Sequence, residues 1–188
     1  MRHRAVARTL VLLVWASPVI PHDTVHADET VCRGSLGDEA VDNLRVPSGA
    51  RCTLDGTRVR GNIKVESGAS LVARRIRVTG NVQAEGARAV SVLSGSTVGG
   101  NIQVKQGEAA TVTRVRVEGD IQLESNDRPL SATDNTVGGN VQLFQNGGGV
   151  TVAGNTVGGN LQCKENRPPP RGGGNTVRGN KEDQCARL

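Results

Sequence analysis

One short segment of the chain brings acidic and basic side chains together at alternate positions. It reads RVEGD and contains Arg116, Glu118 and Asp120. Two carboxylates beside a guanidinium group suit a polysaccharide lyase or hydrolase, which must transfer protons and neutralise an acidic sugar. These three residues are therefore candidate catalytic residues. A charged turn around Gly119 would contain the same residue types and is the alternative interpretation.

A second group of charged residues is basic. Its members recur at related positions of three segments: Arg58, Arg60, Arg75, Arg77, Arg114 and Arg116. If these segments lie above one another, the guanidinium groups form a patch about 15 Å long that attracts anionic glycan or lipid head groups. They are candidate ligand-binding residues, and a solvated surface is the alternative.

The N-terminal segment, residues 1–27, has the organisation of a cleavable secretory signal. Three arginines precede an apolar run from Leu10 to Trp15, and Val25 and Ala27 have the spacing that a signal peptidase reads. The run is shorter than the roughly 20 apolar residues that cross a bilayer. The sequence predicts export to the periplasm or out of the cell, and no membrane span.

Composition excludes several kinds of chemistry from residues 28–188. All three His residues lie in residues 1–27, so histidine-based nucleophile triads and zinc sites are excluded. Phe144 is the one aromatic residue that remains, which disfavours nucleic-acid binding by base stacking. The 23 Lys and Arg and the 18 Asp and Glu fall to 20 and 17, because residues 1–27 hold three Arg and one Asp. We predict no cofactor and no bound metal.

A repeat that runs through the chain must position these side chains. The hexapeptide NTVGGN occupies residues 135–140 and 155–160, and NTVRGN occupies residues 175–180. Alignment of all related segments on their last residue gives spacings of 19 or 20, at Asn43, Asn62, Asn81, Asn101, Asp120, Asn140, Asn160 and Asn180. A fixed period of this size indicates a solenoid.

Each repeat contains short segments of alternating polarity. Ile63 and Val65 flank Lys64, for example, and an earlier apolar pair is Cys52 and Leu54. Strands with one buried face show this alternation, and about 20 residues are too few for a strand and a packed helix. The predicted fold is all-β: a single-stranded, right-handed parallel β-helix of about seven to eight coils, each of about 20 residues.

Stacking of the coils predicts two polar columns. The repeated Asn side chains should form an amide ladder, with Asp120 as its one interruption. A second column, two residues after each ladder position, contains Lys64, Gln83, Gln103, Gln122, Gln142 and Gln162. Such a column either bonds along the stack or offers hydrogen-bonding groups to a polysaccharide.

The four cysteines lie near the two ends of the repeat. An even number in an exported chain predicts disulfides. We predict one bond between Cys32 and Cys52 and another between Cys163 and Cys185, each closing about one coil. The chain then divides into an N-terminal cap with the first coil at residues 28–56, the β-helix coils at residues 57–166, and a C-terminal loop and cap at residues 167–188.

Three stretches of the chain resemble known sequences. They are VPSGARCTLDGTRVRGNIKVESGASL, the repeated VGGN(I/V/L)Q and the terminal GGGNTVRGNKEDQC. Together they resemble a group of small, uncharacterised secreted bacterial proteins; this resemblance implies a right-handed β-helix and no particular activity. The Gly-Asn-Ile/Val repeats are also similar to those of bactofilins, which are cytoskeletal β-helices that form polymers.

These observations lead to one functional expectation and two alternatives. We expect an exported, non-enzymatic β-helix that serves as a structural or binding module at the bacterial envelope or outside it, and that contacts anionic polysaccharide through its arginines. The first alternative is a polysaccharide lyase or hydrolase that uses Arg116, Glu118 and Asp120. The second is a self-assembling surface protein.

Overall fold

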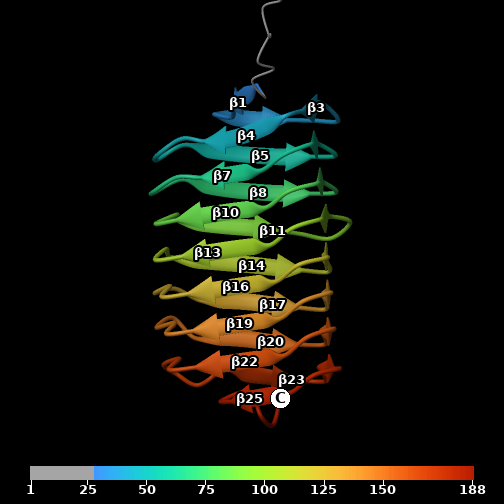
Figure 1. Ribbon diagram of the computed structural model, residues 1–188. Coiled ribbons are helices and arrows are strands. Elements are labelled where there is room, and N and C mark those ends of the chain that lie inside the picture. The colour runs from blue at the N-terminus through green and yellow to red at the C-terminus, as the bar shows by residue number, and fades with distance from the viewer. Residues whose placement is uncertain (1–27) are drawn as a thin grey trace, which may run out of the picture.

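The computed structural model describes residues 28–188, and the predicted secretory signal lies outside them. The described residues form 25 β-strands and no helix. They wind into about eight coils that stack as a rod (Figure 1). This arrangement confirms the predicted all-β, parallel β-solenoid. No helix within residues 28–188 is long and apolar enough to cross a membrane.

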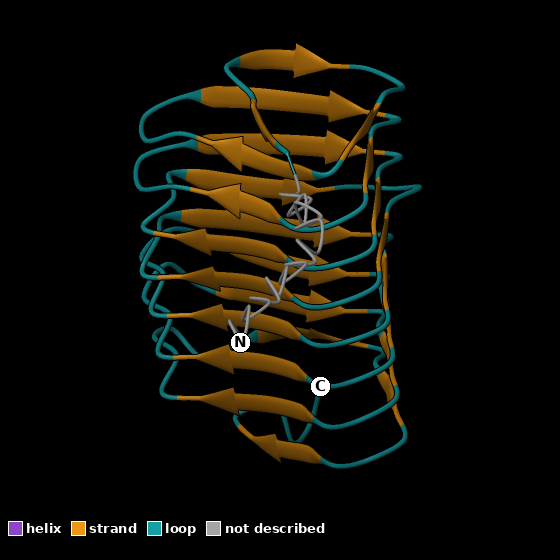
Figure 2. Cartoon of the chain, turned by 45° about the horizontal axis from the view of Figure 1, so that its top comes forward, coloured by secondary structure: helices purple, strands orange, loops and turns teal. Residues whose placement is uncertain are grey.

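Each coil contributes one strand to each of three sheets, which form the three faces of the rod (Figure 2). Sheet A contains β1 (Glu29–Val31), β4 (Asn43–Val46), β7 (Ile63–Val65), β10 (Val82–Glu85), β13 (Ile102–Lys105), β16 (Ile121–Glu124), β19 (Val141–Phe144), β22 (Leu161–Lys164) and β25 (Lys181–Asp183). Sheet B contains β2 (Gly34–Leu36), β5 (Arg51–Asp55), β8 (Ser70–Arg74), β11 (Ala89–Val92), β14 (Ala109–Thr113), β17 (Leu130–Thr133), β20 (Val150–Ala153) and β23 (Arg171–Gly173). Sheet C contains β3 (Ala40–Val41), β6 (Arg58–Val59), β9 (Arg77–Val78), β12 (Thr97–Val98), β15 (Arg116–Val117), β18 (Thr136–Val137), β21 (Thr156–Val157) and β24 (Thr176–Val177).

The pairing register places equivalent residues of successive coils directly above one another. Gln83 of β10 pairs with Lys64 of β7 on one side and with Gln103 of β13 on the other. Every strand pair is parallel, so the backbone groups of one coil bond to the coils before and after it. Each position of the repeat therefore forms a column of side chains that runs along the rod.

The core is built from aliphatic side chains on alternate strand positions. In β7, Ile63 and Val65 are buried while Lys64 between them is exposed. Leu54 of β5 and Val59 of β6 point into the same interior from the other two sheets. Flat stacking suits β-branched and other aliphatic side chains, so the core needs no aromatic residue.

The repeated Asn residues form the predicted outer ladder, but the main bond differs from the expected one. The side-chain oxygen of Asn62 accepts a hydrogen bond from the backbone N–H of Asn81 at 2.8 Å, and Asn81 does the same for Asn101 at 2.8 Å. Only an oxygen is needed at each step. Asp120 therefore continues the ladder, because its Oδ1 accepts the backbone N–H of Asn140 at 2.6 Å. The prediction that Asp120 interrupts the ladder was wrong.

Two further ladders lie inside the rod, and the sequence interpretation missed them. One is formed by Asn135, Asn155 and Asn175, and the other by Asn126, Asn146 and Asn166. Each member of these ladders is buried. Gln184 ends the second ladder, because its Oε1 accepts the backbone N–H of Asn166 at 2.9 Å.

The two inner ladders satisfy backbone groups at corners where the strands separate. The Oδ1 atom of Asn155 accepts from the backbone N–H of Asn135, and its Nδ2 donates to the carbonyl of Ala132 at 2.8 Å. A buried backbone group without a partner would cost about 1–3 kcal/mol. The first Asn of each NTVGGN segment therefore joins successive coils, as the last Asn does.

Both predicted disulfides are present. Cys32 bonds to Cys52 with a Cα–Cα distance of 5.6 Å, and Cys163 bonds to Cys185 with a Cα–Cα distance of 5.3 Å. They link residues 20 and 22 positions apart, which is about one coil. Leu188 packs against the last buried residues, so the C-terminal turn helps to cover that end of the core.

Exchange of Asn for Asp should separate the two kinds of ladder. Asn160→Asp in the outer ladder keeps the oxygen that accepts from Asn180, so we expect a loss below about 1 kcal/mol. Asn155→Asp places a carboxylate at a position that is 1% exposed and removes the donor to Ala132, so we expect a loss of about 3 kcal/mol or more. Urea unfolding measures both. Equal losses in the two variants would contradict this assignment.

Removal of the first disulfide should weaken the N-terminal end of the rod. A bond that closes about 20 residues contributes about 3 kcal/mol by restricting the unfolded chain. We expect Cys32→Ala/Cys52→Ala to lower the free energy of unfolding by about that amount, as measured by urea unfolding under non-reducing conditions. A change smaller than about 1 kcal/mol would show that the stacked coils alone hold this end.

Candidate functional site

Three of the six candidate binding arginines share one outward-facing column on sheet C. Arg58 of β6 pairs in register with Arg77 of β9, and Thr97 of β12 separates Arg77 from Arg116 of β15. All three arginines are exposed. The structure therefore places Arg58 and Arg77 on adjacent coils, as the repeat predicts, and Arg116 two coils further along.

Arg75 and Arg114 lie at the corner that precedes sheet C. Their backbones have φ angles of 52° and 55°, in the left-handed region. Gly95 and Gly154 occupy the same corner in other coils, at φ angles of 80° and 66°. This conformation aims both arginine side chains outward at the edge of the column. Arg60 follows β6 and is exposed beside it.

Acidic residues of the preceding coil neutralise part of this basic surface. Arg58 pairs with Asp38 at 3.1 Å, Arg60 pairs with Asp42 at 3.0 Å, and Arg75 pairs with Asp55 at 2.5 Å, as three separate bridges. Each bridge joins one coil to the next. Exposed ion pairs contribute only about 0–1 kcal/mol each, so a bound anion can replace them at little cost.

Three of the six candidate arginines converge around one shallow depression, which we call the arginine hollow, while Arg60, Arg114 and Arg116 do not line it. It has a volume of about 480 Å³ and is lined by Arg58, Arg75, Arg77, Asp38 and Asp55. Arg77 makes no ion pair with any residue of 28–188, unlike the other two arginines. Three guanidinium groups against two carboxylates leave the hollow with an excess of one positive charge.

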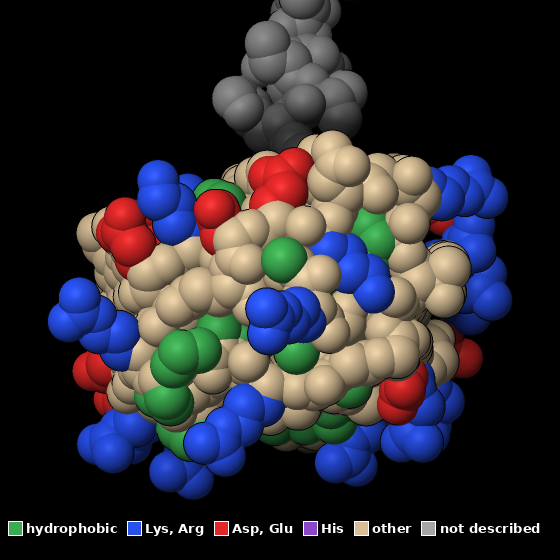
Figure 3. All heavy atoms as spheres, turned by 90° about the horizontal axis from the view of Figure 1, so that it is seen from below, with side chains coloured by type: hydrophobic (Ala, Val, Ile, Leu, Met, Phe, Trp, Pro, Cys, Tyr) green, Lys and Arg blue, Asp and Glu red, His purple; other side chains and the backbone are tan. Residues whose placement is uncertain are grey.

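Basic side chains also surround the C-terminal end of the rod. In Figure 3, which looks at the molecule from below, Lys and Arg side chains project around most of the rim, and fewer acidic side chains lie between them. The last segment, residues 164–188, contains Lys164, Arg167, Arg171, Arg178, Lys181 and Arg187. Positive charge is therefore not confined to the arginine hollow.

The candidate catalytic residues make structural contacts. The Nε of Arg116 donates to Oε1 of Glu118 at 2.8 Å, on the exposed face. The Oδ1 of Asp120 accepts from both the backbone and the side chain of Asn140, at 2.6 and 3.3 Å. Arg116 and Glu118 are thus brought together, while Asp120 belongs to the outer ladder. No group of three or more His, Cys, Asp or Glu within residues 28–188 is placed to hold a metal ion.

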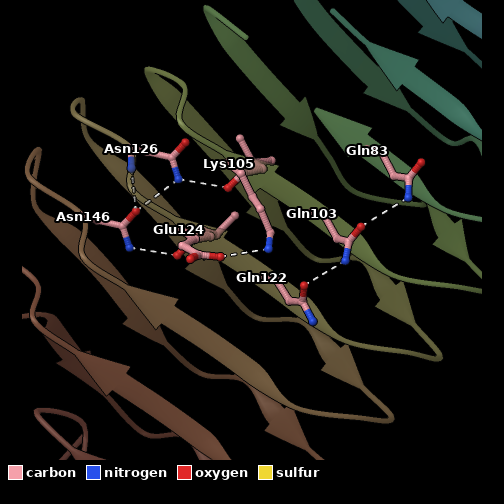
Figure 4. A network of polar contacts seen from close by, with 9 residues as sticks. Gln83, Gln103, Lys105, Gln122, Glu124, Asn126 and Asn146 are labelled. Atoms are coloured by element: carbon pink, nitrogen blue, oxygen red, sulfur yellow. Dashed lines mark hydrogen bonds and ion pairs between the residues drawn. The ribbon is translucent and has the colours of Figure 1, made fainter. Parts of the chain in front are cut away.

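The glutamine column lies on the outer face of sheet A. Figure 4 shows Gln83, Gln103 and Gln122 pointing along the stack, each toward the next. The Nε2 of Gln83 donates to Gln103 at 3.3 Å, and that of Gln103 donates to Gln122 at 2.8 Å. Further along, Gln142 donates to Gln162 at 3.0 Å. The column therefore bonds along the stack in two separate runs, as one of the two interpretations expects, and no side-chain bond between described residues joins Gln122 to Gln142.

A charged cluster at the start of sheet A was not found by sequence reasoning. Arg45 donates to Glu29 at 2.7 Å and lies 3.5 Å from Glu66. Hydrogen bonding to Glu29 raises the pKa of Arg45. The backbone N–H and the hydroxyl of Ser48 both donate to Glu66, at 3.0 and 3.1 Å. The backbone bond is the main reason that the pKa of Glu66 lies below its usual value, and burial opposes it.

A signal for this cluster was present in the sequence. Arg45 follows Asn43 by two positions, which places it in the glutamine column, and Glu66 follows Lys64 of that column by two positions, so both should point to the same face. This end of the column does not resemble a repeat, because the residue type changes from Arg45 to Lys64 to Gln83 in successive coils. A search for columns of any polar residue would have found it.

Comparison with known proteins gives no relative from which a function could be transferred. No family model, curated protein or solved structure matches the chain. The resemblance to secreted bacterial β-helices and to bactofilins thus remains a prediction from the sequence. The β-solenoid fold does not by itself identify an activity.

The lowered pKa of Glu66 predicts a specific pH dependence. Because the folded protein favours the ionised carboxylate, its contribution to stability is complete above the ordinary pKa of 4.5 and is lost as the pH falls through the lower, folded value. Glu66→Gln should therefore be less stable than the wild type at neutral pH. The difference should shrink as the pH falls below 4.5.

Thermal unfolding between neutral pH and about pH 3 tests this expectation. Glu39→Gln is the matched control, because Glu39 is exposed and makes no side-chain hydrogen bond or ion pair with residues 28–188. A constant difference between Glu66→Gln and the wild type across the whole range would contradict the role of the carboxylate charge.

Proposed function

We propose that this protein is an exported, non-enzymatic binding module of the bacterial envelope or the space outside it, and that it holds anionic polysaccharide at the arginine hollow. The observation that carries the proposal is the convergence of Arg58, Arg75 and Arg77 on one exposed depression. Guanidinium groups bind carboxylate and sulfate in a planar, two-pronged geometry. An acidic polysaccharide presents such groups repeatedly.

The arrangement of the three arginines supports this ligand class. Arg58 and Arg77 stand on adjacent strands about 4.8 Å apart, and Arg75 lies at the corner beside them. Arg77 has its donors available, while Arg58 and Arg75 can exchange weak, exposed ion pairs for a ligand. The two disulfides fit an oxidising compartment, where such polysaccharides are found.

A lyase or hydrolase has less support. The carboxylate of Asp120 is engaged with Asn140, and Arg116 is engaged with Glu118. A catalytic carboxylate needs to reach the reacting bond of the sugar, and Asp120 would have to give up its ladder bonds to do so. The binding role requires no such rearrangement.

Substitution of the three arginines tests the proposal. Arg58→Gln/Arg75→Gln/Arg77→Gln should lower the affinity for heparin or polygalacturonate at least about tenfold, since charge-assisted hydrogen bonds contribute about 1.5–3 kcal/mol each. Biolayer interferometry at several salt concentrations measures the effect. Binding by the wild type should weaken as salt rises, because it depends on charge.

The matched control removes the same charge elsewhere. Arg88→Gln/Arg128→Gln/Arg171→Gln changes three exposed arginines that do not line the hollow. We expect the loss of affinity in this control variant to be less than about half of the loss in the hollow variant. If both triple variants lose affinity equally, the attraction arises from total charge and the proposed site is wrong. Absence of wild-type binding at low salt would also refute it.

A further inference from the structure

A second depression of the described surface lies away from the arginine hollow, on the outer face of sheet A. It has a volume of about 730 Å³ and crosses β7, β10 and β13. Two columns of outward side chains line it: Lys64, Gln83 and Gln103 in one, and Glu66, Glu85 and Lys105 in the other. We call this depression the sheet A groove. Ligand sites commonly have volumes of about 300–1,000 Å³.

Small residues at one corner of the rod create the sheet A groove. Ser48, Ser67 and Gly86 occupy the same position after sheet A strands in three successive coils, and all three line the groove. The next coil has Gln106 at the corresponding corner, at a φ angle of 51°. The side chain of Gln106 lines the groove at that coil. This corner of the groove therefore carries only small residues over three coils, before the larger Gln106 in the fourth.

Several groups in the groove have unused hydrogen-bonding capacity. Within residues 28–188, Lys64, Glu85 and Gln106 make no side-chain hydrogen bond or ion pair. Gln83 donates to Gln103, as Figure 4 shows, and its own side-chain oxygen receives no bond from the described residues. Donors and acceptors thus lie side by side over adjacent coils. A ligand must be able both to donate and to accept.

The charges of the groove cancel. Lys64 and Lys105 oppose Glu66 and Glu85, so the surface as a whole attracts neither an anion nor a cation. Lys105 is in addition held by Glu124 at 2.9 Å, outside the groove lining. The chemistry here differs from that of the arginine hollow, which has an excess of positive charge.

The backbone of sheet A limits the partner further. The strands that form the groove are paired on both sides, so an extended peptide finds no free edge to join. A lipid or apolar ligand finds no exposed apolar side chain among the groups that line the surface. A hydroxyl group both donates and accepts through its one oxygen, and neighbouring hydroxyls of a sugar can donate together to one carboxylate.

We infer that the sheet A groove is a second binding site, specific for an uncharged oligosaccharide. Glu85 and the oxygen of Gln83 accept hydrogen bonds from sugar hydroxyls, while Lys64 and the amide of Gln106 donate to sugar oxygens. The oligosaccharide lies along the rod axis, where equivalent groups recur about every 4.8 Å. This site is independent of the proposed function, because it uses other residues on another sheet.

Titration of the purified, exported protein with neutral oligosaccharides tests the inference. The probes are hexamers of β-1,4-linked glucose, β-1,4-linked N-acetylglucosamine and β-1,4-linked mannose. We expect saturable shifts of the side-chain amide signals of Gln83, Gln103 and Gln106 in ¹⁵N–¹H spectra with at least one hexamer. No saturable shift with any of the three at millimolar concentration would overturn the inference.

Two variants distinguish this site from a general surface effect. Glu85→Gln should weaken binding at least about tenfold, because a charged acceptor is lost, while Glu39→Gln should leave it unchanged. Gly86→Gln should fill the groove and abolish binding. The fold should tolerate this change, because Gln106 and Gln145 adopt the same backbone conformation and the nearest atoms, at 3.0 and 3.3 Å, belong to the side chain of Ser67.

Further results would contradict the inference. Equal binding by Glu85→Gln, Gly86→Gln and the wild type would place the sugar elsewhere. Displacement of the hexamer by millimolar diglycine, which carries one positive and one negative charge, would identify the groove as a site for zwitterions instead. The substitutions in the arginine hollow should not change neutral oligosaccharide binding, so failure of one site remains separate from failure of the other.

Discussion

Hydrogen bonding between successive coils is the constraint on which the rest of this structure depends. A coil of about 20 residues has no partner within itself for most of its backbone groups, so each must bond to the coil before or after it. Within the strands, backbone groups of adjacent coils pair with one another. At the corners the strands separate, and side-chain amides replace the missing partners. Asn126 illustrates this, since its backbone N–H donates to the side chain of Asn146.

The outer and inner ladders run in opposite directions. In the outer ladder, the side chain of Asn62 accepts from the following coil, through the backbone N–H of Asn81. In the inner ladder, the side chain of Asn155 accepts from the preceding coil, through Asn135. Each C-terminal coil is therefore joined to both neighbours by side chains as well as by backbone. The one Asp of these ladders lies in the outer one, where an oxygen is enough and the site is partly solvated.

The inner ladder at the position of Asn135 is complete only in the C-terminal half of the rod. The inner position of Asn135 is occupied in earlier coils by Thr57, Ile76, Ser96 and Val115, so the N-terminal half lacks the full inner ladder. The N-terminal half also contains the arginine hollow and the sheet A groove. Between residues 129 and 163, by contrast, Asp134 is the only charged residue. Departures from the repeat thus lie in the half of the rod that contains both candidate binding surfaces.

The sequence was sufficient to predict the fold because its main signals are periodic. Alternation around Lys64 identified the strands, and the cysteine positions identified the two disulfides. The inner ladders were missed because Asn is a common turn residue, although Asn135 aligns with Ile76 and Val115, which are apolar and indicate an inward position. Ion pairs such as Arg58 with Asp38 were also missed, since they depend on side-chain conformation across coils.

The rigidity of the stack determines how both surfaces can bind. Lys64 and Arg77 stand on strands whose neighbouring residues are buried, so a ligand orders only side chains and not the backbone. Since residues 28–188 contain one aromatic residue, affinity must come from hydrogen bonds and charge, without stacking of sugar rings. Binding at the arginine hollow depends on its net positive charge and should weaken as the salt concentration rises. The sheet A groove has no net charge, so binding there should be nearly insensitive to salt. The two proposals thus assign to one rod two kinds of glycan, each held through a different physical effect.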